Sequence, residues 1–228
     1  NRRPEGMMLL KSTQNYLTKL FNQGAVKVDT VGGFKLALHD KHPTAPLSPF
    51  YISLRTPENK RGTLQPEDVD TIAHELVNAA AKKRITYDGV VGIPRAGTPL
   101  ADAIVRHSHG KVAYIPLRKK SSTSRAMRID PRRLSQPARA ARRILIFDDL
   151  ITKSDSKITA INVVKRAGYQ VAGVAVYFDR MQGGYEHIAG MGIPIVRVVT
   201  ITEMLDFYGE KKLISKTDLK KIHAYLGV

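Results

Sequence analysis

The chain has 228 residues, of which 43% are hydrophobic and none is cysteine, and its formal net charge is +17. This composition is typical of a globular protein with a substantial core, and it excludes disulfides, thiol catalysis and cysteine-based zinc sites. No apolar run approaches the roughly 20 residues of a membrane-spanning helix. The excess of 37 Lys and Arg over 20 acidic residues favours a polyanionic partner, either nucleic acid or a phosphorylated small molecule.

The N-terminal part of the chain mixes one helix with short extended segments. Residues 1–7 are expected to be disordered, as an expression remnant or the end of a longer precursor, because the natural start could lie at Met7 or Met8. Helical spacing and alternation of apolar residues then predict the first elements. These are a helix over 8–23, a hairpin over 25–38, a short strand over 50–54 and an amphipathic helix over 66–83.

From residue 89 onward the pattern alternates strand and helix. Strands are predicted over 89–93, 111–116, 143–147, 170–178 and 194–199, with helices over 98–107, 156–167 and 202–207. Near-continuous apolar strands such as 144–147 indicate a parallel sheet that is covered on both faces. The sequence therefore predicts an open α/β fold, whose ligands bind beyond the carboxyl ends of the strands.

One long segment, 117–141, shows no clear periodicity. A loop of that length in a compact domain is usually functional and often acts as a lid. It overlaps a basic run, because residues 118–143 contain ten Lys and Arg and only one acid, Asp130. Three interpretations stay open for this run: solvated surface, a loop that clamps phosphate, or a patch that contacts RNA.

The segment 144–157 carries the clearest chemistry. An apolar strand delivers Asp148 and Asp149 to its carboxyl end, and a hydroxyl-rich turn over 152–156 then opens a helix. Adjacent carboxylates suit the hydroxyls of a ribose, and a helix N-terminus suits a phosphate, so together they suit a ribose 5-phosphate. The alternative is an acidic strand end followed by a helix that Thr152 or Ser154 caps.

The segment 148–157 resembles the phosphoribosyl-pyrophosphate (PRPP) motif of type I phosphoribosyltransferases. Five further pieces, in the same order, resemble the orotate phosphoribosyltransferase branch; they lie at 33–55, 92–101, 118–119, 179–184 and 201–205. The resemblance implies the α/β fold of that family, an open and mostly parallel sheet flanked by helices. It implies a single domain over 8–228, in which 8–60 and the C-terminal part form a small hood and 117–141 is a flexible lid.

The resemblance also implies roles for particular residues. The PRPP-binding set would be Arg95, Ala96, Gly97, Arg118, Lys119, Asp148, Asp149, Thr152, Lys153, Ser154, Asp155 and Ser156. Catalysis would fall to Asp148, Asp149, Lys119 and Lys120, and base binding to Phe50, Tyr51, Thr152 and Arg180. The guanidinium of Arg180 would receive the carboxylate of the base, because its planar geometry favours bidentate pairing.

The cofactor and partners follow from the same resemblance. Mg²⁺ would be held through PRPP near Asp148 and Asp149, without a direct set of protein ligands. The substrates would be PRPP and a nucleobase, with orotate expected, and the protein would act as a homodimer in the cytoplasm. No membrane partner is expected, while the basic surface leaves nucleic acid open as a partner.

Departures from the family pattern in the turn and in the lid keep other functions open. The turn 152–156 carries side chains where the family has glycines, and its Asp155 brings a like charge to an anion site. Ser122 and Ser124 stand where the family's lid has a lysine and a histidine, so Lys120 or Arg125 would have to supply the cation. Besides orotate transfer, the alternatives are a different acceptor base, or a catalytically degenerate protein with a binding or regulatory role on RNA, DNA or a ribonucleoprotein.

Overall fold

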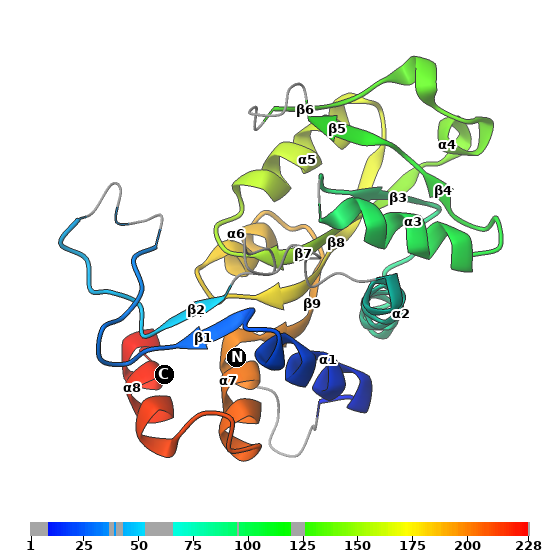
Figure 1. Cartoon of the computed structure of the whole chain (residues 1–228). Coiled ribbons are helices and arrows are strands. Elements are labelled where there is room, and N and C mark those ends of the chain that lie inside the picture. Colours follow the sequence, from blue (N-terminus) through cyan, green and yellow to red (C-terminus); the bar gives the residue numbers. More distant parts are fainter. Residues whose placement is uncertain are drawn as a thin grey trace. The chain divides into compact units, whose positions relative to one another are not determined.

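The computed structural model describes residues 9–36, 39, 43–52, 66–94, 96–119 and 126–227. The chain divides into two compact units (Figure 1). The first unit comprises the described residues of Asn1–Asp68 together with Thr202–Val228, and the second unit comprises Val69–Ile201. No helix in the described part of the chain is long and apolar enough to cross a membrane.

A parallel sheet forms the centre of the second unit. Its strand order is β4-β3-β7-β8-β9, and every neighbouring pair is parallel. The strands are β3 (Gly89–Gly92), β4 (Ala113–Tyr114), β7 (Arg143–Ile151), β8 (Gln170–Asp179) and β9 (Ile195–Thr200). The prediction of an open α/β fold is therefore confirmed.

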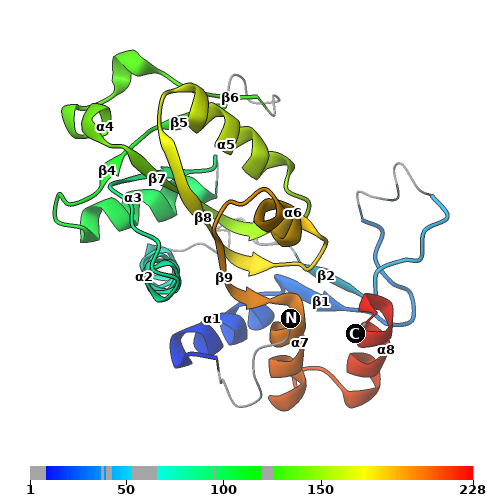
Figure 2. The ribbon, with the colours of Figure 1, turned by 180° about the vertical axis from the view of Figure 1, so that it is seen from behind.

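Helices cover both faces of this sheet, which is why its strands are apolar throughout. The helices are α2 (Pro66–Lys82), α3 (Gly97–His107), α5 (Asp155–Arg166) and α6 (Gly184–Gly190). Side chains of α5 and α6 share one core cluster with alternate residues of β7 and β8, including Ile146 and Val174. On the opposite face the hydroxyl of Tyr177 donates to Glu75 of α2 over 2.9 Å. Figures 1 and 2 show α3 and α5 on opposite sides of the strands.

The direction of chain travel reverses between two neighbouring strands. From β3 the chain passes through α3 to β4 at one edge, whereas from β7 it passes through α5 to β8 and onward to the other edge. In open α/β sheets the crevice for a ligand opens at the carboxyl ends of the strands at such a reversal. The start of α3 after β3, with Ala96 and Gly97, meets the end of β7, with Asp148 and Asp149, at this point.

The predicted lid, 117–141, contains more regular structure than its sequence suggests. Its described residues form an antiparallel pair, β5 (Leu117–Lys119) with β6 (Met127–Ile129), then a 3-10 turn η2 (Pro131–Arg133) and the short helix α4 (Gln136–Ala140). Side chains of Asp130 and Ser135 cap the last two elements. Three-residue strands and a one-turn helix are too short to leave a periodic signal, so the prediction of a loop without regular structure was wrong.

The first unit contains α1 (Lys11–Asn22), β1 (Val26–Val28), β2 (Phe50–Ile52), α7 (Ile201–Glu210) and α8 (Lys216–Leu226). The predicted hairpin over 25–38 is wrong, because β1 pairs antiparallel with β2 instead. The carboxylate of Asp29 accepts the N–H groups of Val31 and Gly32, which turns the chain directly after β1. Tyr208 of α7 donates its hydroxyl to the carbonyl of Leu17 in α1 over 2.8 Å, which joins the two ends of the sequence.

Candidate active site

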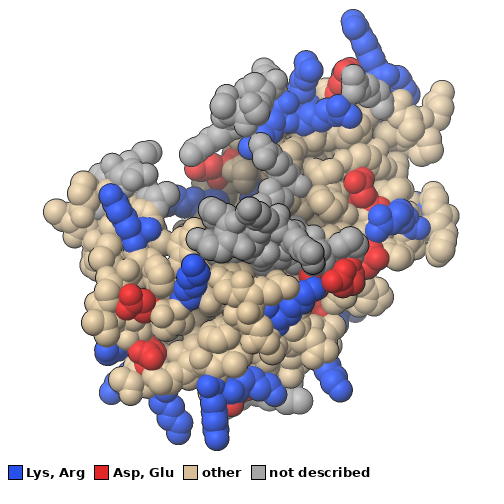
Figure 3. Space-filling model, in the orientation of Figure 1, with Lys and Arg blue, Asp and Glu red and all other residues tan. Residues whose placement is uncertain are grey.

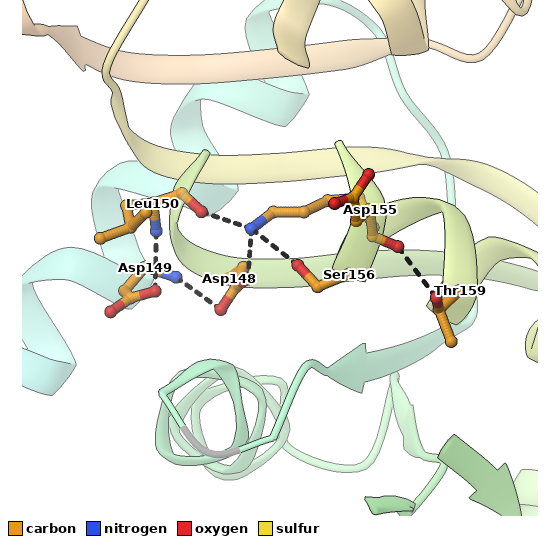
Figure 4. Close-up of polar contacts among 7 residues, drawn as sticks. Asp148, Asp149, Leu150, Asp155, Ser156 and Thr159 are labelled. Atoms are coloured by element: carbon orange, nitrogen blue, oxygen red, sulfur yellow. Dashed lines mark hydrogen bonds and ion pairs between the residues drawn. The ribbon is translucent and has the colours of Figure 1, made fainter. Parts of the chain in front are cut away.

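The two adjacent acids at the end of β7 have different surroundings. Asp148 is 6% exposed, and both of its carboxylate oxygens are engaged. Oδ1 accepts the N–H of Asp149 over 3.0 Å, and Oδ2 accepts the amine of Lys157 over 2.5 Å. Figure 4 shows the same amine reaching Leu150 and Ser156. Asp148 is therefore held within the protein by a buried ion pair with α5.

Asp149 is half-buried, and its carboxylate is less completely engaged. Oδ1 accepts the N–H of Leu150 over 2.8 Å, whereas no described residue donates a nitrogen hydrogen bond to Oδ2. Burial and the neighbouring charge of Asp148 together raise the pKa of Asp149 to about 8, although Lys157 counteracts the shift. A carboxyl group whose pKa is raised by burial and by a specific charged neighbour is typical of a functional site.

The raised pKa of Asp149 predicts how stability depends on pH. The unfolded acid has a pKa of about 3.9, so the folded protein binds more protons than the unfolded chain up to about pH 8. Stability therefore falls as pH rises through this window. We expect the free energy of unfolding to drop by on the order of 1–2 kcal/mol between about pH 6 and about pH 8.5. Urea unfolding of the wild type and of Asp149→Asn at several pH values checks this. If the free energy of unfolding falls equally with pH in both proteins, the prediction is contradicted.

The turn after β7 leads into α5 without a side-chain cap. Ser154 occupies the N-cap position and is 2% exposed, but its hydroxyl makes no capping hydrogen bond. The hydroxyl of Ser154 instead lies 2.7 Å from Nδ1 of His187 in α6. The alternative of a helix capped by Ser154 is therefore wrong, and the first N–H groups of α5 lack a side-chain cap. Free N–H groups at a helix N-terminus are a favourable environment for an anion.

The other residues of the turn differ in exposure. Thr152 and Ser156 are half-buried, whereas Lys153 and Asp155 are exposed. The backbone carbonyl of Asp155 accepts the hydroxyl of Thr159 over 2.9 Å, a bond that lies within α5 (Figure 4). The side chains of Lys153 and Asp155 therefore face solvent. From there Lys153 could attract a phosphate bound at the turn, and Asp155 could repel it.

A second turn, after β8, packs against the first. Gly184 donates its N–H to the carbonyl of Thr152 over 3.0 Å, and a Cβ at Gly184 would lie only 2.3 Å from that carbonyl oxygen. Gly183, with φ of +84°, is the N-cap residue directly before α6. Arg180 is half-buried in this turn, and its backbone N–H donates to the carbonyl of Ile151 over 3.0 Å. The structure thus brings Thr152 and Arg180 to the same edge of the sheet.

The loop after β3 lies beside the acid pair. Ala96 and Gly97 open α3, and both are buried. A Cβ at Gly97 would lie 2.2 Å from the carbonyl oxygen of Phe147, the residue before Asp148. Only glycine, which has no side chain, allows this contact. The contact brings the start of α3 next to the end of β7. Arg95 lies outside the described residues.

This close contact predicts a strong effect of the substitution Gly97→Ala. The new methyl group would clash with backbone atoms of β7, which cannot move without disturbing the sheet, so we expect a loss of about 3 kcal/mol of stability. Urea unfolding measures the loss. Gly190→Ala in α6 is the matched control, because a Cβ there meets nothing within 4 Å and the variant should unfold like the wild type. Equal stability of the two variants would contradict the prediction.

Two arginines of the predicted lid face each other across a strand pair. Arg118 of β5 lies opposite Arg128 of β6, and both are exposed. Like charges directly opposite each other destabilise an antiparallel pair unless an anion lies between them. Residues 117–129 contain five basic residues and no acid. Figure 3 shows Lys and Arg side chains gathered over this part of the second unit. Lys119 pairs with Met127, and Lys120 lies outside the described residues.

The predicted base-binding aromatic residues belong to the first unit. Phe50 is 4% exposed, and its ring meets that of Tyr225 edge-on at 6.2 Å. Tyr51 is half-buried, with its ring 5.9 Å from that of Phe34. Phe50 is therefore part of the hydrophobic core of this unit, whereas the side chain of Tyr51 is partly exposed to solvent.

Three residues of interest escaped the sequence-based prediction: Lys157, His187 and Arg128. Lys157 lies in the first turn of a helix, where a positive charge is unfavourable because it opposes the helix dipole. A lysine at this unusual position could have been identified from the sequence as a candidate for a special role. His187 and Arg128 reach Ser154 and Arg118 only through tertiary or cross-strand contacts, so no local pattern marks them.

Comparison with protein families gives one match, to the phosphoribosyl transferase domain over residues 64–201. Among curated relatives, the orotate phosphoribosyltransferase of Pyrobaculum islandicum is 32% identical over 183 residues, which cover 79% of this chain and 86% of the relative. The orotate phosphoribosyltransferase of Sulfolobus acidocaldarius is 25% identical over 201 residues, covering 88% of this chain and 91% of the relative.

Solved structures share the fold. The orotate phosphoribosyltransferase of Aeropyrum pernix superposes with a TM-score of 0.61 at 22% identity, over 85% of this chain and 98% of its own. The UMP synthase of Leishmania donovani superposes with a TM-score of 0.68 at 22% identity, over 94% of this chain and 42% of its own. At this level of identity the likeness establishes the fold.

Proposed function

Because the chain belongs to the phosphoribosyl transferase domain family and, within it, to the orotate phosphoribosyltransferases, we propose that it transfers the phosphoribosyl group of PRPP to orotate. The observation that carries the proposal is Asp149, a half-buried carboxyl group at the strand reversal between β3 and β7, whose Oδ2 accepts no nitrogen hydrogen bond from the described residues. In the reaction a nitrogen of the base forms a bond to C1 of the ribose. The C1–oxygen bond to pyrophosphate breaks, and the nitrogen loses its proton.

The surrounding residues supply binding and charge rather than covalent chemistry. Asp149 would accept hydrogen bonds from the ribose hydroxyls, and the uncapped N-terminus of α5 would receive the 5-phosphate. The backbone at Gly97 would lie along the pyrophosphate, where Arg118 would add positive charge from the lid. Such groups accelerate the reaction by orienting both substrates and by stabilising charge on the leaving pyrophosphate.

Magnesium fits this arrangement as an ion carried by the substrate. No group of three or more acidic, histidine or cysteine side chains that could hold a metal occurs in the described part of the chain. Mg²⁺ would therefore be held mainly through PRPP, close to Asp149, whose Oδ2 receives no nitrogen hydrogen bond from the described residues. Mg²⁺ in proteins commonly uses one or two carboxylates and completes its shell with substrate phosphates and water. When bound, the ion would neutralise charge on the pyrophosphate.

The acceptor base would be recognised through Arg180. Its guanidinium can pair bidentately with a carboxylate, the group that distinguishes orotate from other pyrimidine bases. The rigid backbone of the turn, bonded to Ile151, would keep this side chain at the same edge as Asp149. We also propose that the protein acts as a homodimer in the cytoplasm. Analytical ultracentrifugation of the purified protein tests whether it is a dimer.

A second candidate function rests on the cross-strand arginines. The pair Arg118 and Arg128, with the acid-free segment 117–129 around them, would also suit a polyanion such as RNA. RNA binding of this kind weakens steeply as salt rises. A mobility-shift assay at low salt separates the two candidates, because RNA binding without PRPP binding would favour the second.

The main experiment combines turnover with binding. Purified protein is supplied with Mg²⁺, PRPP and orotate, and the release of pyrophosphate is measured; calorimetry with Mg²⁺ and PRPP gives the affinity directly. We expect turnover with orotate and none with uracil, which lacks the carboxylate. The absence of both turnover and PRPP binding would contradict the proposed function, whereas turnover with a different base alone would keep the enzyme class and replace the acceptor.

A further inference from the structure

Lys157 is the only buried lysine among the described residues, with 3% of its surface exposed. Its amine lies 2.5 Å from Oδ2 of Asp148, 2.5 Å from the carbonyl oxygen of Leu150 and 3.4 Å from the hydroxyl of Ser156 (Figure 4). An ammonium group has three donors, and each has an acceptor here. One side chain therefore links the end of β7 to the first turn of α5, across the turn between them.

This position is unfavourable for a lysine unless the contacts compensate. The N-terminal turn of a helix carries a positive partial charge, and burying an ammonium group costs several kcal/mol. The turn it spans, 152–156, also contains no glycine, so the contacts of Lys157 add to the backbone packing of Gly184 against Thr152 in fixing its shape. These two facts indicate that Lys157 has a positioning role in the turn.

The contacts of Lys157 also make the two acids unequal. Asp148 has both oxygens occupied, by Lys157 and by the N–H of Asp149. Asp149 has one oxygen bonded to Leu150, and the other accepts no nitrogen donor from the described residues. An oxygen that already accepts a short bond from a buried ammonium is poorly placed to receive a sugar hydroxyl as well.

We propose that Lys157 is a positioning residue that divides the acid pair into two roles. Its amine holds Asp148 as an internal support of the site, and this leaves Asp149 as the carboxylate that contacts the ribose diol. The inference rests on the proposed function, because it assigns the two carboxylates of the same ribose site. It differs from the expectation that both acids bind the sugar.

A double-mutant cycle tests the division. The variants are Lys157→Met, Asp148→Asn and the double variant, each measured for melting temperature without ligand, PRPP affinity by calorimetry and KM for orotate. Each single variant leaves one buried group without its partner, so we expect the melting temperature to fall by about 10 °C. We also expect the PRPP dissociation constant to rise about tenfold, because the turn loses its shape.

The double variant removes both charges and leaves neither unpaired. We expect it to recover at least about half of the lost melting temperature and to bind PRPP about fivefold more tightly than either single variant. The KM for orotate should change less than about twofold in all three, since Lys157 acts on the ribose side of the site. A merely structural defect would change both substrates together.

Different results overturn different claims. A double variant that binds PRPP no better than the single variants would make Asp148 itself a ligand and refute the inference. A PRPP affinity of Lys157→Met within about twofold of the wild type would refute the positioning role. If the wild-type protein binds no PRPP, the proposed function fails and the inference with it, whereas the first two results refute the inference alone.

Discussion

Asp149→Asn is expected to lower kcat/KM for PRPP about a thousandfold while leaving the fold intact. Above about pH 8, where Asp149 is ionised, two charge-assisted hydrogen bonds from the ribose diol to its carboxylate contribute about 4 kcal/mol, which an amide, with one acceptor oxygen, cannot replace. The ion pair between Asp148 and Lys157 remains, so the melting temperature should not fall. Steady-state kinetics and calorimetry with PRPP measure the effect.

Asp155→Asn is the matched control for this substitution. It makes the same replacement of an acid by its amide in the same segment, but Asp155 is exposed and lies beside the expected phosphate rather than the diol. Removing a like charge from an anion site should leave PRPP affinity unchanged or strengthen it. A rate for Asp149→Asn within about tenfold of the wild type would show that Asp149 does not hold the sugar.

Arg180→Ala is expected to raise the KM for orotate about a hundredfold without changing PRPP affinity. The loss corresponds to about 3 kcal/mol, the contribution of a charge-assisted, bidentate pair between guanidinium and carboxylate. The turn itself should persist, because Arg180 joins Ile151 through its backbone N–H. Initial rates at saturating PRPP, with orotate varied, give the KM.

Two further variants define what is specific about Arg180. Arg180→Lys keeps the charge but loses the planar fork, so we expect an intermediate rise of about tenfold. Arg166→Ala removes an exposed arginine from the last turn of α5 and should behave as the wild type. If Arg180→Ala changes the KM for both substrates equally, the side chain supports the turn rather than binding the base.

Elements with strong local patterns were predictable from the sequence. The helices α2, α3 and α5 and the strands β3, β7 and β8 lie within a few residues of the predicted ranges. Their apolar residues are numerous enough to set a period, and turn residues separate them clearly. Strands of two or three residues, such as those in the segment 117–141, escaped prediction because a period needs a longer run.

Pairing between distant segments was not predictable. The alternation near Gly32 suggested a local hairpin, yet Val26–Val28 pairs with Phe50–Ile52, more than twenty residues later. The local turn at Asp29 changes the direction of the chain before a hairpin can close. Such a choice depends on which strands bury their side chains best, and a local pattern contains no information on that competition.

The sequence alone determined the α/β class, the order of the motifs and the presence of two acids at a strand end, because these depend on local spacing. Only the tertiary structure decided how the acids differ. It brings the amine of Lys157 to Asp148, nine residues away in the chain, whereas one oxygen of Asp149 receives no nitrogen donor from the described residues. It also places Gly97 against Phe147, fifty residues away. Contacts of this kind arise from packing between elements, which the sequence encodes only through the whole fold.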